Sequence, residues 1–402
     1  MEYSENRLAD YSEDSSIGRG SIDVPFLLLV LLLLTIGVVM VLSASFARAY
    51  YSAATKHTAT YYFTRQLFFA VTGVAIMLLA SRFPIGFYRR FSGVLLLFSV
   101  VMLLLVLVGG ERVNGARRWF KIASITFQPS EIAKIAVILF EAQLICRFKE
   151  RMRTFRYGVL PFAATAALII GLLVLEPHLS GSIIIILLTA VMMFIGGTRL
   201  FWFLLGGGAV ALGGVIAINV LHYSGERISA WLDPFADTSD TGYQIVQSLY
   251  AIGSGGLSGL GLGNGRQKYL YLPEEHNDFI FSVVCEELGF IGAAAILILF
   301  ALLIARGFFL AMHCRDRYSF LVCTGVTALL AIQVILNVAV VTNLIPCTGI
   351  SLPFFSYGGT ALWLQLAEMG VILSISRDVP EKKFIKPRQP RSPQRDQAGA
   401  GA

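Results

Sequence analysis

An acidic residue, Asp278, ends the polar run PEEHND that begins at Pro273 and leads directly into a long apolar segment. Asp278, Ser282 and Glu286 follow one another at four-residue spacing, which would place them on roughly one face of a helix. Such a column of polar side chains could line a cavity, where a carboxylate can act as a general base toward a hydroxyl group. The alternative is that Asn277 or Asp278 only caps the helix that follows. The spacing alone leaves both interpretations open.

Four positive charges surround Trp119 in a second polar stretch, ERVNGARRWFKIASITFQP, at residues 111–129. They belong to Arg112, Arg117, Arg118 and Lys121. Arginine and lysine side chains can stabilise a leaving pyrophosphate, and together with an acid they would suit transfer of a group from a pyrophosphate to a hydroxyl. The alternative is an interfacial segment that contacts lipid phosphates, with Trp119 at the membrane boundary.

Other ionisable residues lie within or beside apolar segments, where a charge is costly and indicates a functional site. Glu131 and Lys134 are three residues apart and are expected to pair on one helix face. Glu287 points to about the opposite side from Glu286 and is expected to pair with another helix. The remaining residues of this kind are Glu176, His178 and Glu368. No His/Cys metal spacing, Ser-His-Asp arrangement or nucleotide-binding fingerprint competes with this chemistry.

The elements that must position these residues are membrane helices. The chain is 56% hydrophobic and 14% charged, which predicts an all-α polytopic membrane protein. Apolar runs close to the bilayer-spanning length recur about ten times. The first lacks the cleavage site of a signal peptide. We expect spans near residues 24–44, 63–81, 91–109, 130–146, 158–175, 179–196, 200–221, 279–305, 320–343 and 359–376.

Charge sets the orientation of these spans. Ten spans place both termini on one side, and most basic residues fall on that side, so the positive-inside rule makes both termini cytoplasmic. The chain then divides into a tail at 1–22, a membrane domain at 23–377 and a basic, disordered tail at 378–402. Residues 222–278 form one long extracytoplasmic loop between the seventh and eighth spans. Membrane loops also explain the net charge of +7 better than a nucleic-acid partner, which is not expected.

The long loop has structure of its own. Tyr243, Val246 and Tyr250 recur at helical spacing, which predicts a short interfacial or re-entrant helix. Seven glycines follow between Gly253 and Gly265 and permit sharp turns and close backbone approach. No Gly-Lys-Ser/Thr follows them, so they are not a phosphate-binding P-loop. The alternative is a merely flexible loop. The five scattered cysteines indicate neither a disulfide framework nor a zinc site.

Four motifs, in this order, closely resemble the SEDS family of FtsW, RodA and SpoVE. They read NGARRWFKIASITFQPSEIAK, GYQIVQSLYAIGSGGLSGLGLG, YLPEEHNDFIFSVVCEELG and LPFFSYGGTA. The resemblance covers about Val24 to Arg377 and is greatest to the division and sporulation branch of FtsW and SpoVE. The usual family signature has a small residue, often glycine, where this sequence has Asn343.

The resemblance implies a peptidoglycan glycosyltransferase that polymerises lipid II at the outer face of the bacterial plasma membrane. It maps the family's essential acid onto Asp278 as general base. Expected substrate contacts are Arg117, Trp119, Lys121, Glu131, Lys134, Lys268, Glu275, His276, Ser282 and Glu286. A divalent cation, magnesium or manganese, is a further expectation at the pyrophosphate, without a ligand set in the sequence. The implied partners are a class B penicillin-binding transpeptidase and other membrane proteins of the divisome or of sporulation.

Two alternatives from other classes stay open. A lipid II flippase or another lipid-linked transporter would also use ionisable residues inside spans, although a transporter holds such groups near the midplane. Asp278 is expected at the outer edge, which favours an external reaction. A scaffold that only recruits division proteins would not need Asp278.

Overall fold

The computed structural model describes residues 20–379, apart from 114–115, 123–124, 209–224 and 237–241. The long helices are α2 (Val24–Tyr51), α3 (Tyr61–Ala80), α4 (Ile85–Gly109), α5 (Pro129–Phe148), α7 (Leu160–Leu175), α8 (Leu179–Gly196), α12 (Ile280–Met312), α13 (Arg317–Val341) and α14 (Gly359–Ser376). Shorter helices are α6 (Phe155–Gly158), α10 (Gly225–Leu232), α11 (Tyr243–Gly255) and the 3-10 turns η2 (Ala53–Thr55) and η3 (Lys149–Arg153).

Most of the long helices suit a bilayer. Eight helical segments are long and apolar enough to cross a membrane, with α6 and α7 counted together as Phe155–Leu175. The fourth predicted span, 130–146, matches α5, which carries charged residues such as Glu131 and Lys134 and is not among those eight. Residues 200–208 are helical, but most of the predicted span at 200–221 lies outside the described residues, as do the tails at 1–19 and 380–402. The chain is a multi-pass helical membrane protein, as predicted.

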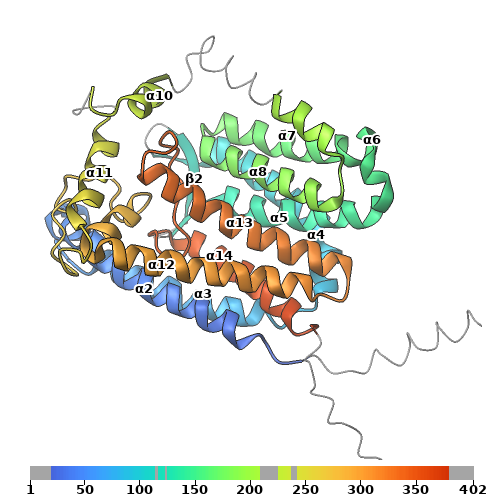
Figure 1. Ribbon diagram of the computed structural model, residues 1–402, viewed down its shortest axis with the longest axis horizontal. Helices are drawn as coiled ribbons and strands as arrows, with labels where there is room; N and C mark the ends of the chain where they lie inside the picture. The colour runs from blue at the N-terminus through green and yellow to red at the C-terminus, as the bar shows by residue number, and fades with distance from the viewer. Residues whose placement is uncertain (1–19, 114–115, 123–124, 209–224, 237–241, 380–402) are drawn as a thin grey trace, which may run out of the picture.

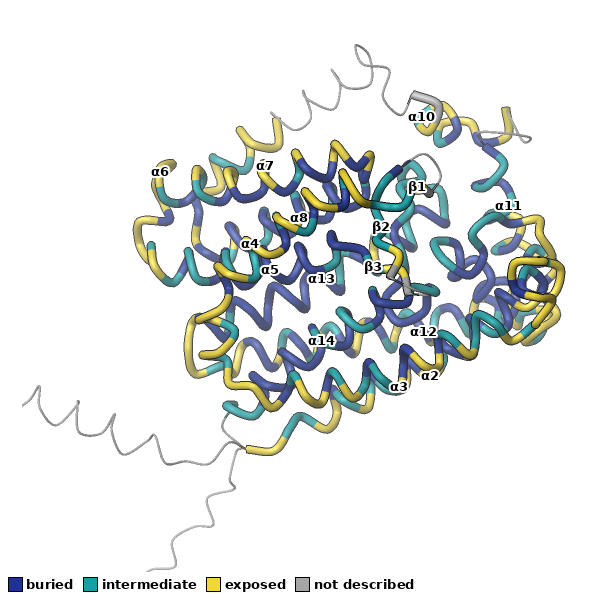
Figure 2. Tube along the Cα trace, turned by 180° about the vertical axis from the view of Figure 1, so that it is seen from behind, coloured by how far each residue is buried: buried dark blue, intermediate teal, exposed yellow. Residues whose placement is uncertain are grey.

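The helices form one bundle in which α13 and α14 lie deepest (Figure 2). The largest interhelical contacts join α3 to α14, α4 to α5, and α12 to both α13 and α11 (Figure 1). The two ends of the described chain meet at one end of the bundle, where the Gly20 N–H donates to Arg377 O at 3.0 Å. This contact agrees with an even number of spans.

Asp23 fixes the start of α2 at that same end. Its side chain accepts a hydrogen bond from Phe26 N at 2.9 Å, and a proline stands in the first turn, which is the sequence signature of a helix N-terminus. The Asp23 carboxylate also pairs with Arg306 of α12 at 2.5 Å. The pair ties the first described helix to the longest one.

A small antiparallel sheet lies at the other end of the bundle (Figure 2). It consists of β1 (Glu111–Val113), β2 (Ala116–Ile122) and β3 (Ile125–Phe127), in the order β1-β2-β3. Glu111 is the register partner of Trp119, and Phe120 is that of Phe127. The sequence predicts only a loop here, so the sheet is an addition to the all-helical expectation.

Helix α12 is broken at Gly289, whose φ of 66° and ψ of −171° are not helical. In an unbroken helix the carbonyls of Glu286 and Glu287 would accept from the N–H groups four residues later. Here a glycine-rich segment, residues 256–261, satisfies all four freed groups. The bonds run from Leu260 N to Glu286 O (3.0 Å), Gly261 N to Glu287 O (3.0 Å), Phe290 N to Gly256 O (2.9 Å) and Ile291 N to Leu257 O (3.1 Å). The glycine-rich stretch is therefore packed structure built onto α12.

Two glycines make this close approach possible. A Cβ atom on Gly259 would lie 2.2 Å from Glu287 O, and one on Gly289 would lie 2.2 Å from Gly259 N. The dihedral angles of Gly289 also fall in a region that essentially only glycine occupies. Close backbone approach, one of the uses expected from the sequence, is the use that the structure makes of these residues.

Gly289→Ala should therefore destabilise the protein strongly. We expect roughly 1–3 kcal/mol of backbone strain and a further roughly 1–3 kcal/mol of overpacking against residues 256–261. Thermal unfolding of the purified protein in detergent measures the effect. Gly93→Ala in α4 is the control, because nothing lies within 4 Å of a Cβ at Gly93, and it should unfold at the wild-type temperature or slightly above. Equal melting of the two variants would contradict the assigned role of Gly289.

Candidate active site

A cavity of about 1030 Å³ lies at the end of the bundle that carries the sheet. Its lining comes from β2, the first turns of α5 and α8, the turn before α12, and the connection between α13 and α14. Four of the residues predicted from the sequence line it, namely Asp278, Trp119, Glu131 and Lys134. The cavity therefore brings the predicted acid together with part of the predicted cationic cluster.

Asp278 lies two residues before α12 and is not its cap. The N-cap residue is Phe279, and no side chain caps the helix, so the cap interpretation is wrong. The carboxylate lines the cavity, where no side chain of the described residues hydrogen-bonds to it. Burial, and then the negative charge of Glu274, raise the pKa of Asp278 to about 6, while His276 and Arg118 act in the opposite direction. The Asp278 carboxylate is thus free of side-chain hydrogen bonds from the described residues, and its pKa lies close to neutral pH.

The backbone around Asp278 is firmly held. Asn337 of α13 donates through Nδ2 to Asp278 O at 2.8 Å and to Ile350 O at 2.6 Å. The carbonyl of Asn277 accepts from Ser356 Oγ at 2.8 Å. The carbonyl of His276 accepts from Tyr357 N, also at 2.8 Å. Three successive carbonyls are therefore fixed by neighbouring elements, and the Asp278 side chain is left free to face the cavity.

Cationic side chains share the cavity with Asp278. Lys134 Nζ lies 2.6 Å from Glu131 Oε2, which confirms the pairing predicted from their spacing. Arg118 donates through Nε to the carbonyl of Glu176 at 3.1 Å and through Nη2 to that of Pro177. Both acceptors are neutral carbonyls, so these two hydrogen bonds do not remove the positive charge of the guanidinium. Arg65 and Arg227 complete the cationic lining.

Helix N-termini add to this positive field. The first turns of α5, α8 and α14 line the cavity through Ser130, Ser180 and Gly359, and none of the three helices has a side-chain cap. The first N–H groups of a helix lack intrahelical acceptors, and the helix dipole adds partial positive charge at that end. An uncapped N-terminus is a favourable place for phosphate. The lining is therefore suited to an anionic group.

Two buried titratable residues beside Arg118 do not cancel that field. Burial raises the pKa of Glu176 to about 8, with the Arg118 charge opposing. Burial and the charges of Arg118 and Lys134 lower the pKa of His178 to about 3. Near pH 7 both side chains are mainly uncharged. Neither carboxylate oxygen of Glu176 has a hydrogen-bond partner among the described residues, which fits a protonated group.

Two predicted cationic contacts point elsewhere. Arg117 donates to the carbonyls of Leu107 and Val108 at 3.0 and 3.3 Å and so closes the end of α4. Lys121 makes an exposed ion pair with Glu111 at 3.1 Å. Neither residue lines the cavity. Within the cluster, Arg118 and Trp119 are the members that reach it.

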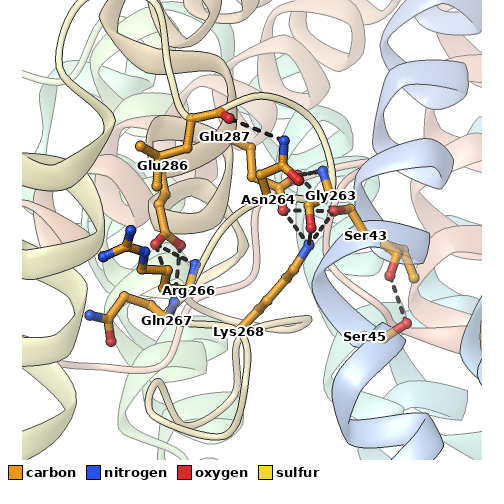
Figure 3. Close-up of polar contacts among 11 residues, drawn as sticks. Ser43, Ser45, Gly263, Asn264, Arg266, Gln267, Lys268, Glu286 and Glu287 are labelled. Atoms are coloured by element: carbon orange, nitrogen blue, oxygen red, sulfur yellow. Dashed lines mark hydrogen bonds and ion pairs between the residues drawn. The ribbon is translucent and has the colours of Figure 1, made fainter.

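Lys268 and Glu286 belong to a buried network instead of the cavity (Figure 3). Glu286 accepts hydrogen bonds from the backbone N–H groups of Arg266 and Gln267 at 2.7 and 3.2 Å. Glu287 pairs with Lys268 at 2.6 Å and accepts from Ser43 Oγ of α2 at 2.7 Å. The contact with α2 confirms that Glu287 meets another helix. The network anchors residues 263–268 between α2 and α12.

The other three predicted contacts also act as supports. Glu275 makes a bidentate pair with Arg48 of α2, at 2.7 and 2.8 Å. The His276 ring packs on Tyr62 with ring centroids 4.7 Å apart. Ser282 Oγ lies 2.7 Å from Ser248 Oγ and joins α12 to α11. The prediction that Ser282 and Glu286 continue a cavity wall below Asp278 is wrong, because residues 243–268 pack over that face of α12.

The structure also adds lining residues that the sequence reasoning passed over. The charged ones are Arg65, Arg227 and Glu274. The orientation predicted from the sequence puts Arg65 and Arg227 on the side that should be poor in cations, and this is the signal that could have found them. Glu274, instead of its neighbour Glu275, faces the cavity because the turn after Pro273 sends the two side chains in different directions.

Fold and cavity define a polytopic membrane protein with a carboxylate and several cationic side chains in one cavity at one end of its bundle. Comparison with known proteins identifies the family. The model described as "Cell cycle protein", FtsW/RodA/SpoVE, matches residues 24–381. The chain belongs to this family, as its motifs indicated.

Individual relatives agree with the family model. The chain is similar to the probable peptidoglycan glycosyltransferase FtsW of Trichlorobacter lovleyi, with 41% identity over 358 residues that cover 88% of this chain and 93% of the relative. It is similar to stage V sporulation protein E of Bacillus subtilis, with 40% identity over 363 residues that cover 89% and 98%.

Solved structures give the same result. A chain of a peptidoglycan synthase complex, described as coordinating polymerization and crosslinking, matches with a TM-score of 0.73 and 30% identity over 89% of this chain and 98% of that one. The rod shape determining protein RodA of Thermus thermophilus matches with a TM-score of 0.66 and 28% identity, over 91% and 99%.

The Lys268–Glu287 pair should be strongly coupled. Lys268→Met leaves a buried carboxylate without its cation, and Glu287→Gln leaves a buried ammonium group; each should cost roughly 3–5 kcal/mol. The double variant should cost much less than the sum, because no unpaired charge is left. Thermal unfolding in detergent measures all three. Lys121→Met, which breaks an exposed pair, is the control and should have little effect. Additive losses in the double variant would rule out the buried pair.

Proposed function

We propose that this chain is a peptidoglycan glycosyltransferase that polymerises lipid II into β-1,4-linked glycan strands, with Asp278 as general base. The observation that carries the proposal is the Asp278 carboxylate, which shares one cavity with Arg118, Lys134 and three uncapped helix N-termini. A base beside an anion-binding lining is what sugar transfer from a pyrophosphate requires. The names of the relatives point to the same activity.

Asp278 would take the proton from the 4-hydroxyl of the acceptor's GlcNAc. The freed oxygen attacks the anomeric carbon of the donor, and the bond from that carbon to the pyrophosphate oxygen breaks. An α-linked pyrophosphate gives a β-glycosidic bond, so the reaction proceeds with inversion. Undecaprenyl pyrophosphate leaves with the bonding electrons. The free carboxylate of Asp278, with its backbone fixed through Asn337, is suited to this proton transfer.

The leaving pyrophosphate would lie against the cationic lining. Arg118 supplies a full charge, Lys134 supplies one that it shares with its ion-pair partner Glu131, and the first turns of α5, α8 and α14 supply backbone N–H groups. Arg117 and Lys121 are the weaker candidates, since their contacts turn them away from the cavity. The protein's contribution is a set of fixed donors that need no rearrangement as negative charge develops.

We propose a magnesium or manganese ion at the pyrophosphate only as one that binds together with the substrate. No group of three or more His, Cys, Asp or Glu side chains among the described residues comes together to hold a metal ion. Magnesium is often held by one or two carboxylates together with substrate phosphates, so an ion here would depend on bound substrate. No step above is assigned to it.

The proposed activity also implies a membrane location and partner proteins. We place the protein in the bacterial plasma membrane, with Asp278 at the outer face and both termini in the cytoplasm. The similar solved chain comes from a complex described as joining polymerization to crosslinking, which supports a class B penicillin-binding transpeptidase as partner. Similarity to FtsW and to stage V sporulation protein E supports an interaction of this protein with membrane proteins of division or sporulation.

Asp278→Asn should abolish polymerisation while the protein stays folded, because the amide cannot accept the proton. Purified protein with its transpeptidase partner is given labelled lipid II, and glycan strands are resolved on a gel. Wild type should give long strands, and the variant should give none at an unchanged melting temperature. Equal polymer from both would overturn the assignment of the base. No polymer from either, with lipid II crossing vesicle membranes, would favour a flippase.

The rate of polymerisation should fall as pH decreases through about 6, because Asp278 must be ionised to act as base and its pKa is raised to about 6. Glu274→Gln removes a negative charge that raises this pKa, so the acid limb should move to lower pH. Initial rates between pH 4.5 and 8 measure the shift. Glu111→Gln, an exposed acid outside the cavity lining, is the control and should keep the wild-type profile. An unmoved limb in Glu274→Gln would count against Asp278 as the titrating group.

A further inference from the structure

Helix α10 lies apart from the bundle, at the end that carries the sheet (Figure 1). Residues outside the described part of the chain flank it on both sides, at 209–224 and 237–241. Two of its side chains, those of Arg227 and Trp231, hydrogen-bond to other parts of the chain. Those contacts converge on the turn that follows α13.

A reciprocal pair of hydrogen bonds, the Trp231–Asn343 clasp, joins α10 to this turn. Trp231 Nε1 donates to Asn343 O at 3.1 Å, and Asn343 Nδ2 donates to Trp231 O at 3.2 Å. Asn343 has a φ of 57°, in the left-handed region that asparagine tolerates better than most residues other than glycine. Asn343 thus adopts the left-handed backbone conformation of the turn, and its side-chain Nδ2 supplies a hydrogen-bond donor that glycine lacks.

The clasped turn continues to the candidate base. Gly349 lies so close to Asp278 that a Cβ at Gly349 would be 3.0 Å from Asp278 Oδ2. Asn337 Nδ2 bonds both Asp278 O and Ile350 O. The segment 343–350 is thus held by α10 at its start and by the Asp278 region at its end. It forms part of the cavity lining in between.

Arg227 is the cation that this arrangement presents to the cavity. It lines the cavity, its side chain is exposed, and it donates through Nη1 to Cys347 O at 3.2 Å. A guanidinium has five N–H donors, and the carbonyl uses one while leaving the charge in place. No carboxylate of the described residues forms an ion pair with it.

We propose that Arg227 binds an anionic group of the substrate at the cavity, and that the Trp231–Asn343 clasp is the positioning element that holds Arg227 there. The inference rests on the proposed glycosyl transfer and adds residues to its site. The anionic group is either the pyrophosphate or a carboxylate of the peptide that lipid II carries.

The kinetic test compares lipid II polymerisation by wild type, Arg227→Gln and Arg227→Lys. Loss of a charged hydrogen bond should raise KM about 10-fold or more, and lysine should restore part of the affinity. The kcat should stay within about twofold if Arg227 binds the peptide carboxylate, and should fall as well if it binds the leaving pyrophosphate, where negative charge develops. An unchanged KM in Arg227→Gln would overturn the anion-binding role. Inorganic pyrophosphate serves as a competitor. If KM is raised and pyrophosphate inhibits Arg227→Gln more weakly than it inhibits wild type, the group that Arg227 binds is the pyrophosphate. If KM is raised and the inhibition is the same in both proteins, that group is the peptide carboxylate.

The clasp is tested with Asn343→Asp, which keeps the shape but removes the donor, Asn343→Gly, which keeps the backbone conformation, and Trp231→Phe, which keeps most of the ring. Each should raise KM by less than Arg227→Gln does. Combining Asn343→Asp with Arg227→Gln should add nothing further, because the clasp acts through Arg227. Lys56→Gly is the matched control: Lys56 is an exposed loop residue with a φ of 54°, and its variant should keep the wild-type KM.

Amide hydrogen exchange gives a readout that does not depend on catalysis. Exchange within residues 225–232 should be faster in the three clasp variants and unchanged in Lys56→Gly. Wild-type exchange in all three variants would overturn the clasp even if the enzyme is active. If wild type makes no polymer, the proposed function fails, while the exchange measurement still decides whether the clasp exists.

Discussion

Satisfaction of the backbone groups freed at Gly289 is the constraint on which the site depends. Inside a membrane protein every backbone N–H and C=O needs a partner within the protein. The break in α12 exposes two carbonyls and two N–H groups, and residues 256–261 bond to all four. These four hydrogen bonds fix the glycine-rich segment at one place on α12. The polypeptide that leads to Asp278 therefore starts from a fixed point.

From that point the chain is held at almost every step. Glu286 and Glu287 bind residues 263–268 through backbone N–H groups and Lys268 (Figure 3), and Arg48 then binds Glu275. Three carbonyls up to Asp278 are bonded to α13 and to the segment before α14. The irregular stretch before α12 is thereby fixed by hydrogen bonds to neighbouring elements. This explains how the Asp278 carboxylate, which has no hydrogen-bond partner among the described residues, can keep a defined position.

The sequence predicts the parts of this arrangement that depend on local spacing or on charge. Run lengths predict the spans, and a separation of three residues predicts the Glu131–Lys134 pair. The motif around Asp278 predicts the acid. The role of Glu286 could not be predicted in this way, because a helical face shows which residues align and not which segment packs over them. The choice between Arg117 and Arg118 depends on a sheet that we did not expect, although Asn-Gly at 114–115 is a typical hairpin sequence.

Burial of the cavity lining affects both the proton transfer to Asp278 and the binding of the pyrophosphate. Partial burial, together with the negative charge of Glu274, raises the pKa of Asp278 to about 6, so that it is mainly ionised near pH 7 and still basic enough to take a proton. The same low-dielectric surroundings strengthen the attraction of Arg118, Lys134 and the helix N-termini for a phosphate. Glu176 and His178 stay mainly uncharged there and leave that attraction intact. A more open cavity would weaken the base and the anion site together, so the supports that close the cavity matter as much as the residues that line it.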